Sequence, residues 1–477
     1  MNKFTKIVAT VSDKRCDVEF IRSLAEAGVN VVRMNSAHLE FEGFQKIVNN
    51  TREADDSLAI MLDTKGPEVR TTATMTGEDI EIIAGSKVTF EGNPERLTTP
   101  DYICVNYADI TKVVKVGDRL LIDDGELCFN IDEVNGNTLT ATAENGGMLG
   151  SRKSVNIPGV SLDLPSVTER DRRNIGYGVQ LGVDFIAHSF VRSADDVRMV
   201  QEILDSLGGK QKIISKIENQ EGIDHFDEIL QESYGIMVAR GDLGIEIAAE
   251  RIPALQAMMV RKCITAHKPV IVATQMLHTM IEHPRPTRAE VSDVANAVYQ
   301  RADAIMLSGE TAYGKYPREA VKVMTRVAHE VEATMVREEE VPPISDRNIT
   351  SFLAREAVIS ERQIGTSAIF TDAFRGVAAR TVASFRGNTP TYAICHKRDV
   401  QRWLALSYGV KAYYDPQPDN WIPRHSVGAV EQIVRDGHVK MNDLIAYITG
   451  TRRGARAIEF LTPQDLCDEE PQHDSCH

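Results

Sequence analysis

Eight short apolar runs, most of them separated by stretches that are amphipathic at helical spacing, constrain the fold of this chain more than any other feature. Buried parallel strands read as continuous runs rich in Val, Ile, Leu and Ala, and their alternation with helices indicates βαβ units. Eight such units predict a closed (β/α)₈ barrel in an α/β protein. The runs cover residues 6–11, 29–35, 58–64, 183–189, 212–218, 235–241, 269–275 and 302–308.

Two segments depart from this pattern. After the third run the helical period gives way to short alternating segments, and turn pairs at Asn135-Gly136 and Gly146-Gly147 favour hairpins. A second α/β pattern begins after the polar stretch REEEVPPISDRN. We therefore expect three domains: a catalytic barrel formed by residues 1–70 and 166–342, an inserted β-barrel domain (lid) after strand three at 71–165, and a C-terminal α/β domain at 343–477.

Composition excludes several classes of protein. A net charge of -15 opposes general attraction to nucleic acid or anionic lipid, and no apolar run approaches the roughly 20 residues that span a bilayer. The seven cysteines are scattered and never form a C-x-x-C pair, so neither a disulfide framework nor a zinc site is indicated. The first residues enter a strand pattern without a secretory signal, and we expect a cytoplasmic location.

Polar side chains stand where the predicted barrel strands end. The carboxyl ends of the strands meet at one face of a barrel, so these residues are expected to form one ring. A single charge at a strand end is usually a solvated loop residue, but repetition over seven strands favours a site for a charged ligand. The ring comprises Arg33, Asn35, Asp63, Thr64, Lys65, His188, Ser189, Lys216, Glu218, Arg240, Asp242, Thr274, Gln275, Ser308 and Glu310.

Two carboxylates in this ring suggest a metal site. Glu218 and Asp242 follow neighbouring strands and have no His/Cys set nearby, which favours Mg²⁺ or Mn²⁺ over zinc. The alternative is that they serve Lys216 or Arg240 as counterions. Lys216 and Glu218 are two positions apart on a strand and point to the same side. A lysine beside a carboxylate-held metal suits phosphoryl transfer, because that transition state needs positive charge more than covalent chemistry.

Six segments resemble the active-site motifs of the pyruvate kinase family and follow one another in the family's order. The resemblance covers essentially the whole chain. It implies transfer of a phosphoryl group from phosphoenolpyruvate to ADP, giving pyruvate and ATP, and it implies a homotetramer. The segments are LDTKGPEVR at 62–70, IISKIENQEGI at 213–223, MVARGDLGIEI at 237–247, ATQML at 273–277, PRPTRAEVSDVANAV at 284–298 and IMLSGETAYGKYP at 305–317.

The resemblance also implies roles for individual residues. Glu218 and Asp242 would hold Mg²⁺ or Mn²⁺, and Lys216 would stabilise the moving phosphoryl group. Backbone amides near Gly241 and Asp242 would hold the substrate carboxylate together with the Thr274 hydroxyl. The remaining implied roles are phosphate contact for Arg33 and Arg70, a proton route for Ser308 and Glu310, nucleotide contact for Arg70, Lys153 and His38, and K⁺ coordination for Asn35, Asp63 and Thr64.

This chain departs from the family pattern at the monovalent-cation site. The usual R-x-N-F-S-H reads Arg33-Met34-Asn35-Ser36-Ala37-His38, so a serine that helps ligate K⁺ is Ala37 here, and Ser36 should point to the opposite side. Glu68 resembles the glutamate of K⁺-dependent members, which would otherwise lack a neutralising charge. We expect a K⁺ requirement with weakened affinity.

The C-terminal domain gives no clear effector site. FTDAFRGVAAR at 370–380 lacks the Ser/Thr cluster that binds an effector phosphate in many relatives. GTRRGARA at 450–457, with Arg452 and Arg453, could hold an anion, but a solvated basic loop is the simpler interpretation.

Two rival functions stay open at the level of sequence. One is a metal-dependent aldolase or phosphoenolpyruvate mutase, since these also use acidic barrels and enolates. The other is a catalytically silent scaffold, which should have lost Lys216, Arg33 or a metal carboxylate, yet this chain retains them all.

Overall fold

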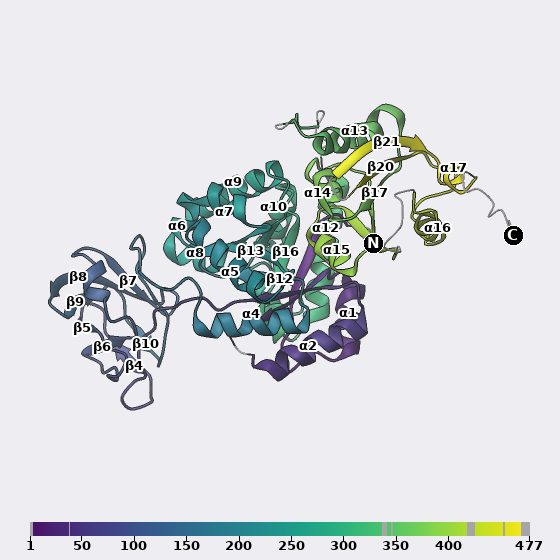
Figure 1. Cartoon of the computed structure of the whole chain (residues 1–477). Coiled ribbons are helices and arrows are strands. Elements are labelled where there is room, and N and C mark those ends of the chain that lie inside the picture. The colour runs from purple at the N-terminus through teal and green to yellow at the C-terminus, as the bar shows by residue number, and fades with distance from the viewer. Residues whose placement is uncertain are drawn as a thin grey trace.

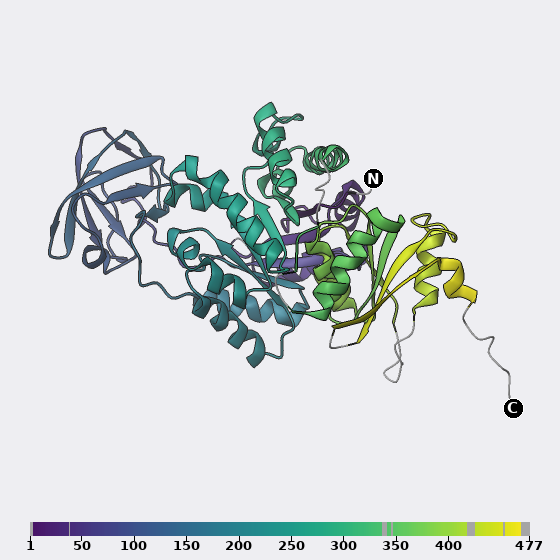
Figure 2. The same cartoon turned by 90° about the horizontal axis from the view of Figure 1, so that it is seen from above.

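The computed structural model describes residues 3–37, 39–335, 341–344, 347–416, 425–451 and 454–468. It consists of a central barrel with the inserted β domain at one end and the C-terminal α/β domain at the other, and both views show this arrangement (Figures 1 and 2). The inserted domain follows the third barrel strand, as expected. The residue at which each domain begins and ends stays a prediction.

Eight parallel strands close the barrel in the order β1-β16-β15-β14-β13-β12-β3-β2. Each predicted run contains one strand, and every strand is one to three residues shorter than its run. All runs but that of β2 extend past the end of the strand into the loop that follows it, and several also begin before the strand does. The strands are β1 Lys6–Thr10, β2 Val31–Asn35, β3 Ala59–Asp63, β12 Phe185–His188, β13 Lys212–Ile217, β14 Gly235–Ala239, β15 Val270–Ala273 and β16 Ala304–Leu307.

Amphipathic helices surround the barrel. In α1, Ile21 and Leu24 are buried, and Asp17 caps the helix by accepting a hydrogen bond from the Phe20 amide. Gly28 ends α1 with a φ of +124°, where an added Cβ would come within 2.4 Å of Thr325 Oγ1. The helices are α1 Val18–Ala27, α2 Phe41–Ala54, α4 Glu169–Leu181, α5 Ala194–Ser206, α6 Gln220–Asp224, α7 Phe226–Glu232, α8 Arg240–Glu246, α9 Ile252–Thr265, α10 Arg288–Tyr299, α11 Gly309–Ala312 and α12 Pro317–Thr334.

Apolar side chains fill the interior of the barrel, among them Met61, Phe185 and Met237. The C-terminal domain contributes one residue to this cluster, Leu406, which is fully buried. Trp403 packs against the same cluster. A side chain from another domain therefore closes the barrel interior at the end where the strands begin.

The inserted domain is a β structure with its own apolar core, which includes Phe90 and Phe129. Its main sheet has six strands in the order β11-β7-β8-β9-β5-β6, and β10 pairs with β4. The elements are β4 Ile80–Ile82, β5 Lys87–Gly92, β6 Tyr102–Val105, α3 Ile110–Val113, β7 Arg119–Ile122, β8 Leu127–Asn135, β9 Thr138–Ala143, β10 Gly147–Leu149 and β11 Val155–Asn156.

The C-terminal domain is a five-stranded sheet in the order β19-β18-β17-β20-β21, with only β21 antiparallel to its neighbour. Arg386 joins it to the barrel through both carboxylate oxygens of Asp303, at 3.0 and 2.7 Å. The elements are α13 Ile349–Ile364, β17 Ala368–Ala373, α14 Val377–Ser384, β18 Thr391–Cys395, α15 Arg398–Trp403, β19 Val410–Tyr414, α16 Val427–Arg435, β20 Ile445–Thr451, β21 Gly454–Leu461 and α17 Pro463–Asp468. Among the described residues, no helix has the length and apolar character needed to cross a membrane.

Candidate active site

Lys216, near the end of β13, is the centre of a buried network at the carboxyl ends of the strands. Its ammonium donates to Ser189 Oγ at 2.8 Å and lies 2.9 Å from Glu218 Oε1 and 3.2 Å from Asp63 Oδ1. Burial lowers the pKa of Lys216, but the carboxylates of Asp63, Glu218 and Asp242 outweigh it and raise that pKa above its ordinary value. Lys216 is therefore a permanent positive charge in a nearly closed site.

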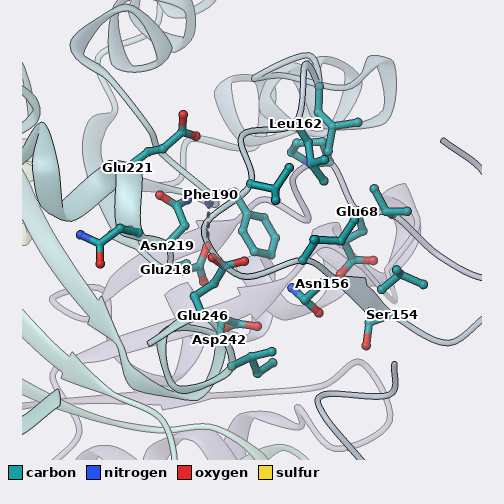
Figure 3. A pocket seen from close by; sticks show the side chains of 18 of the residues that line it. Glu68, Ser154, Asn156, Leu162, Phe190, Glu218, Asn219, Glu221, Asp242 and Glu246 are labelled. Carbon is teal, nitrogen blue, oxygen red and sulfur yellow. Dashed lines mark hydrogen bonds between the residues drawn. The ribbon is translucent and has the colours of Figure 1, made fainter. Parts of the chain in front are cut away.

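Glu218 has one oxygen that is fixed and one that is not. Oε2 accepts a hydrogen bond from the Phe190 amide at 2.7 Å, whereas Oε1 is buried and accepts no hydrogen bond from the described residues. Burial, reinforced by the charge of Asp242 and opposed by Lys216, raises the pKa of Glu218 to about 7. Figure 3 shows Glu218 and Asp242 close together at the floor of the cleft.

These two carboxylates fit a hard divalent cation. Two neighbouring carboxylates repel each other, and Lys216, whose Nζ lies 2.9 Å from Glu218 Oε1, is shared with Asp63 and offsets only part of their charge, so a further cation would stabilise the pair. Among the described residues, no group of three or more His, Cys, Asp or Glu side chains is arranged to hold a metal. Glu218 and Asp242 would therefore share the ion with ligands from substrate or water.

Arg33, on β2, reaches the network through Asp63. Its Nε lies 2.6 Å from Asp63 Oδ2, and its Nη1 donates to Thr10 Oγ1 at 2.9 Å. Burial opposes the charge of Asp63, but Arg33 and Lys216 together lower the pKa of this carboxyl below its ordinary value. Asp63 thus stays ionised and holds two cations toward the mouth of the barrel.

The expected K⁺ ligands lie around this network. Asn35 Oδ1 accepts a hydrogen bond from the Ala37 amide at 3.0 Å, and Thr64 Oγ1 accepts one from the Ser189 amide at 3.0 Å. The hydroxyl of Ser36 is buried and has no hydrogen-bond partner among the described residues.

The argument from Glu68 needs correction. Its carboxylate lies 2.6 Å from Arg70 Nε and 3.1 Å from Lys65 Nζ, and these cations lower its pKa in spite of burial. Glu68 therefore does not lack a neutralising charge. The reason is local: the sequence places Lys65 and Arg70 within one short segment around it.

Thr274 follows β15 in an unusual conformation. Thr274 and Gln275 have φ values of +69° and +53°, a region that costs roughly 1–3 kcal/mol for a residue with a side chain. Thr274 Oγ1 accepts a hydrogen bond from the Gly241 amide at 2.7 Å. The structure thus brings Thr274 to the start of α8, beside Asp242.

Ser308 and Glu310 follow β16, and their loop is fixed by a buried carboxylate. Glu310 Oε2 accepts a hydrogen bond from the Ser308 amide at 2.8 Å, and Oε1 accepts one from the Leu277 amide at 3.1 Å. Glu310 is only 2% exposed. It ties this loop to the loop after β15, and its part in a proton route stays a prediction.

A cleft of about 550 Å³ lies between the inserted domain and the mouth of the barrel. Lys153 lines it from the lid, with its Nζ 2.7 Å from Asp123 Oδ2, and Arg70 lines it from the junction of barrel and lid, where it donates to Arg152 O at 2.7 Å. Glu218 and Asp242 line it from the barrel side. His38, the third expected nucleotide contact, lies outside the described residues, as do Arg452 and Arg453 of the C-terminal loop.

Three residues of the cleft had no sequence signal. Phe190 supplies the amide that fixes Glu218. Arg192 donates to the backbone oxygens of Leu162 and Leu164, both at 2.8 Å. These two leucines belong to the segment 157–165 that leads from the lid back to the barrel, the lid's return linker. Glu246 accepts a hydrogen bond from the Gly159 amide of this linker, and burial raises the pKa of Glu246 to about 7. These residues act through backbone groups, so residue type and spacing do not reveal them.

Comparisons with known proteins agree with this geometry. Residues 2–321 match the family model "Pyruvate kinase, barrel domain", and residues 352–460 match "Pyruvate kinase, alpha/beta domain". Pyruvate kinase of Borreliella burgdorferi is 44% identical, over 98% of this chain and 98% of its own length. Pyruvate kinase of Geobacillus stearothermophilus is 41% identical, over 95% of this chain and 78% of its own length.

A solved structure has the same fold. The crystal structure of a pyruvate kinase from Cryptosporidium parvum has a TM-score of 0.91 and 34% identity, and the match covers 97% of this chain and 96% of that one. The family models together span most of the sequence, and the relatives match at nearly full length. The chain belongs to the pyruvate kinase family, whose members transfer a phosphoryl group from phosphoenolpyruvate to ADP.

Proposed function

We propose that the cleft between lid and barrel is where this chain transfers the phosphoryl group of phosphoenolpyruvate to ADP, giving pyruvate and ATP. One observation carries the proposal: Lys216 Nζ lies 2.9 Å from Oε1 of Glu218, which lines the cleft together with Asp242. An ammonium and a pair of carboxylates at this spacing suit a moving phosphoryl group. The aldolase, mutase and scaffold alternatives lose their support once the family is known.

Glu218 and Asp242 hold the divalent cation, Mg²⁺ or Mn²⁺, in this proposal. The cation supplies positive charge to the oxygens of the phosphoryl group and of the enolate. The Phe190 amide fixes Glu218 Oε2, so the unbonded Oε1 is left for coordination. Lys216, on β13 two residues before Glu218, contributes its own charge and stabilises the phosphoryl group as it moves.

Arg33 and Thr274 orient phosphoenolpyruvate. Arg33 is held by Asp63 at 2.6 Å, and its guanidinium contacts the phosphate. The Thr274 hydroxyl and the backbone at Gly241 and Asp242 receive the substrate carboxylate. The Gly241 amide donates to Thr274 Oγ1 and the Thr274 hydroxyl donates to Ala273 O, both at 2.7 Å, so these two donors change partners when the carboxylate binds.

The enolate left by phosphoryl transfer needs a proton on its methylene carbon. Ser308 is the group that we place on this route, with Glu310 holding its backbone. The Glu310 carboxylate already accepts two backbone hydrogen bonds, which supports a positioning part for it in the proton transfer.

The inserted domain contributes the nucleotide side. Lys153 lines the cleft from the lid and Arg70 from the junction of barrel and lid, and both contact the phosphates of ADP, together with His38. Closure of the lid over the mouth excludes water, which would otherwise capture the phosphoryl group. Asn35, Asp63 and Thr64 would hold K⁺, which would supply a further positive charge to the site. We further propose a cytoplasmic homotetramer, as the family resemblance implies.

A coupled assay with phosphoenolpyruvate, ADP and Mg²⁺ tests this function. We expect pyruvate and ATP to form in equal amounts, and no pyruvate to form when ADP is omitted. Formation of phosphonopyruvate, or consumption of phosphoenolpyruvate without ATP, would instead support a mutase or another enolate-forming enzyme.

A further inference from the structure

The backbone around Thr274 is held in a conformation that its own sequence disfavours. Thr274 and Gln275 both have positive φ, at +69° and +53°, and Thr274 is β-branched, which makes the left-handed region especially unfavourable. Such a conformation persists only where surrounding groups fix it. The groups that fix it are therefore part of how the site is built.

Arg240, the first residue of α8, supplies most of these contacts. Its Nη2 donates to Thr274 O at 2.7 Å and approaches Met276 Sδ at 2.8 Å, and its Nε donates to Ala273 O at 3.2 Å. One guanidinium thus contacts three of the four consecutive residues 273–276. Its side chain is 12% exposed, so these hydrogen bonds are largely shielded from water.

Asp293, on α10, fixes the guanidinium in turn. Its two oxygens accept from Nη1 at 2.7 Å and from Nη2 at 2.8 Å, a bidentate geometry that orients a planar group strongly. Gln256 Oε1 accepts a further, longer bond of 3.4 Å from Nη1. Arg240 therefore has one orientation, and α10 anchors it.

These contacts join the start of α8 and the loop after β15 in both directions. The Arg240 side chain holds the backbone of Thr274, and the Thr274 hydroxyl holds the backbone amide of Gly241 at 2.7 Å. Gly241 is followed by Asp242, the proposed metal ligand. The distance between the loop after β15 and the start of α8 is thus set by a side chain that does not line the cleft.

We propose that the Arg240–Asp293 ion pair is a positioning device that places the Thr274 hydroxyl for the carboxylate of phosphoenolpyruvate. Neither residue of the pair contacts substrate. The inference rests on the proposed function, because it assigns this pair the task of tuning the carboxylate subsite. Without the pair, Thr274 relaxes out of the left-handed region and its hydroxyl leaves the Gly241 amide.

The first test compares R240M and D293N with a matched control, R52M. Arg52 also joins an aspartate, Asp184, at 2.8 Å and donates to Leu58 O at 2.6 Å, but it lies at the opposite end of the barrel strands. We expect kcat/KM for phosphoenolpyruvate to fall roughly 10- to 100-fold in R240M and D293N, as misplacement of a substrate-orienting group does. KM for ADP should change less than about twofold, and R52M should keep the wild-type value for both substrates.

The second test asks whether Arg240 acts through Thr274. If it does, T274A combined with R240M should lose no more than the worse of the two single variants, because both remove the same interaction. R240K keeps the charge but lacks the planar fork, and it should be as impaired as R240M. Additive losses, full activity in R240K, or an equal loss in R52M would each overturn the proposal.

A crystal structure of R240M separates this inference from the proposed function. We expect Thr274 to adopt a negative φ and its hydroxyl to move away from the Gly241 amide. If Thr274 keeps its conformation, the positioning role is wrong even though the enzyme transfers the phosphoryl group. If the wild-type protein shows no transfer but Thr274 moves in R240M, the function is wrong and the positioning stands.

Discussion

Lys216 and Asp63 are 153 positions apart in the sequence, yet their side chains meet with 3.2 Å between Nζ and Oδ1. Asp63 also holds Arg33, so one carboxylate orients two cations at the mouth of the barrel. Removing any one of the three leaves an uncompensated buried charge, which costs far more than an exposed ion pair does. The charges that we propose for catalysis are thus linked to the stability of the barrel.

Replacing Lys216 by Met should abolish most phosphoryl transfer. The variant loses the fixed charge that stabilises the transition state, and we expect kcat to fall roughly 10³-fold or more. Titration with Mn²⁺, followed by its electron paramagnetic resonance signal, should still show binding, because both carboxylates remain. Near-normal turnover in a folded K216M protein would refute the role given to Lys216.

Replacing Glu218 by Gln should weaken the divalent site instead. The amide keeps the shape and can still accept the Phe190 hydrogen bond, but it lacks the negative charge. Mn²⁺ affinity should fall by at least the ~10- to 100-fold that follows loss of a supporting residue at a metal site. Calorimetric titration measures this, and unchanged affinity would place the cation elsewhere. E221Q, at another glutamate lining the cleft, is the matched control.

Restoring a serine at position 37 should strengthen the response to K⁺. The hydroxyl of A37S adds one ligand beside Asn35, and a gain of about 1 kcal/mol corresponds to roughly 5-fold lower half-saturating K⁺. Activity is measured over a K⁺ series at constant ionic strength, with tetramethylammonium as the balancing cation. Activity that does not depend on K⁺ in the wild-type chain would contradict the expected requirement.

Loss of the Arg192 side chain should loosen the lid's return linker. In R192M the backbone oxygens of Leu162 and Leu164 lose their 2.8 Å hydrogen bonds to the barrel. Hydrogen exchange over residues 157–165 should become faster, and hydrolysis of phosphoenolpyruvate without ATP formation should increase as water enters the cleft. Unchanged exchange in this segment would show that other contacts hold the linker.

Asp372, in the C-terminal domain, makes stability depend on pH. It is buried, Tyr447 donates to its Oδ1 at 3.0 Å, and its Oδ2 has no hydrogen-bond partner among the described residues. Burial raises the pKa of Asp372 from 3.8 to about 7. The folded state thus holds a proton that the unfolded state releases, and stability falls as pH rises from about 4 to about 7 by at most roughly 4 kcal/mol.

The variant D372N removes this dependence while its Oδ1 still accepts from Tyr447. We expect its thermal midpoint to exceed that of the wild type at pH 8, with a gain that shrinks by pH 5. Unfolding scans at the two pH values, followed by circular dichroism, measure the difference. A gain of the same size at both pH values would mean that the carboxyl does not titrate in this range.

The sequence predicted the barrel well because its strands are buried on both faces. The run KIISKIE is mostly apolar, and Lys216 and Glu218 stand at its end, where barrel residues enter the site, so the pattern indicated both the strand and Lys216. Its other polar residues lie elsewhere, since Lys212 packs over Trp403 and Ser215 forms a hydrogen bond with Ser233. The resemblance to the family motifs then implied a role for many of the polar residues. These are properties of local residue order, which a sequence displays directly.

Contacts made through backbone groups could not be predicted in this way. The bonds from Arg240 to Thr274 O and from Arg192 to Leu162 O depend on where a carbonyl points, and any residue can supply one. The pairing of Glu68 with Arg70 was also missed, because residues two apart on a regular strand point the same way only when the strand continues. The contacts of Arg240 and Arg192 arise from tertiary geometry, whereas the Glu68–Arg70 pair depends on the local course of the backbone.

Leu406 gives the C-terminal domain an influence on the barrel that a surface contact would not. Leu406 completes the apolar cluster inside the barrel. A fragment that ends after α12 would therefore expose the remaining apolar side chains of this cluster to water. Such a fragment should aggregate when expressed alone. Any tilt of the C-terminal domain would also shift the side chains packed against Leu406 inside the barrel, at the end of the strands opposite to the proposed substrate site.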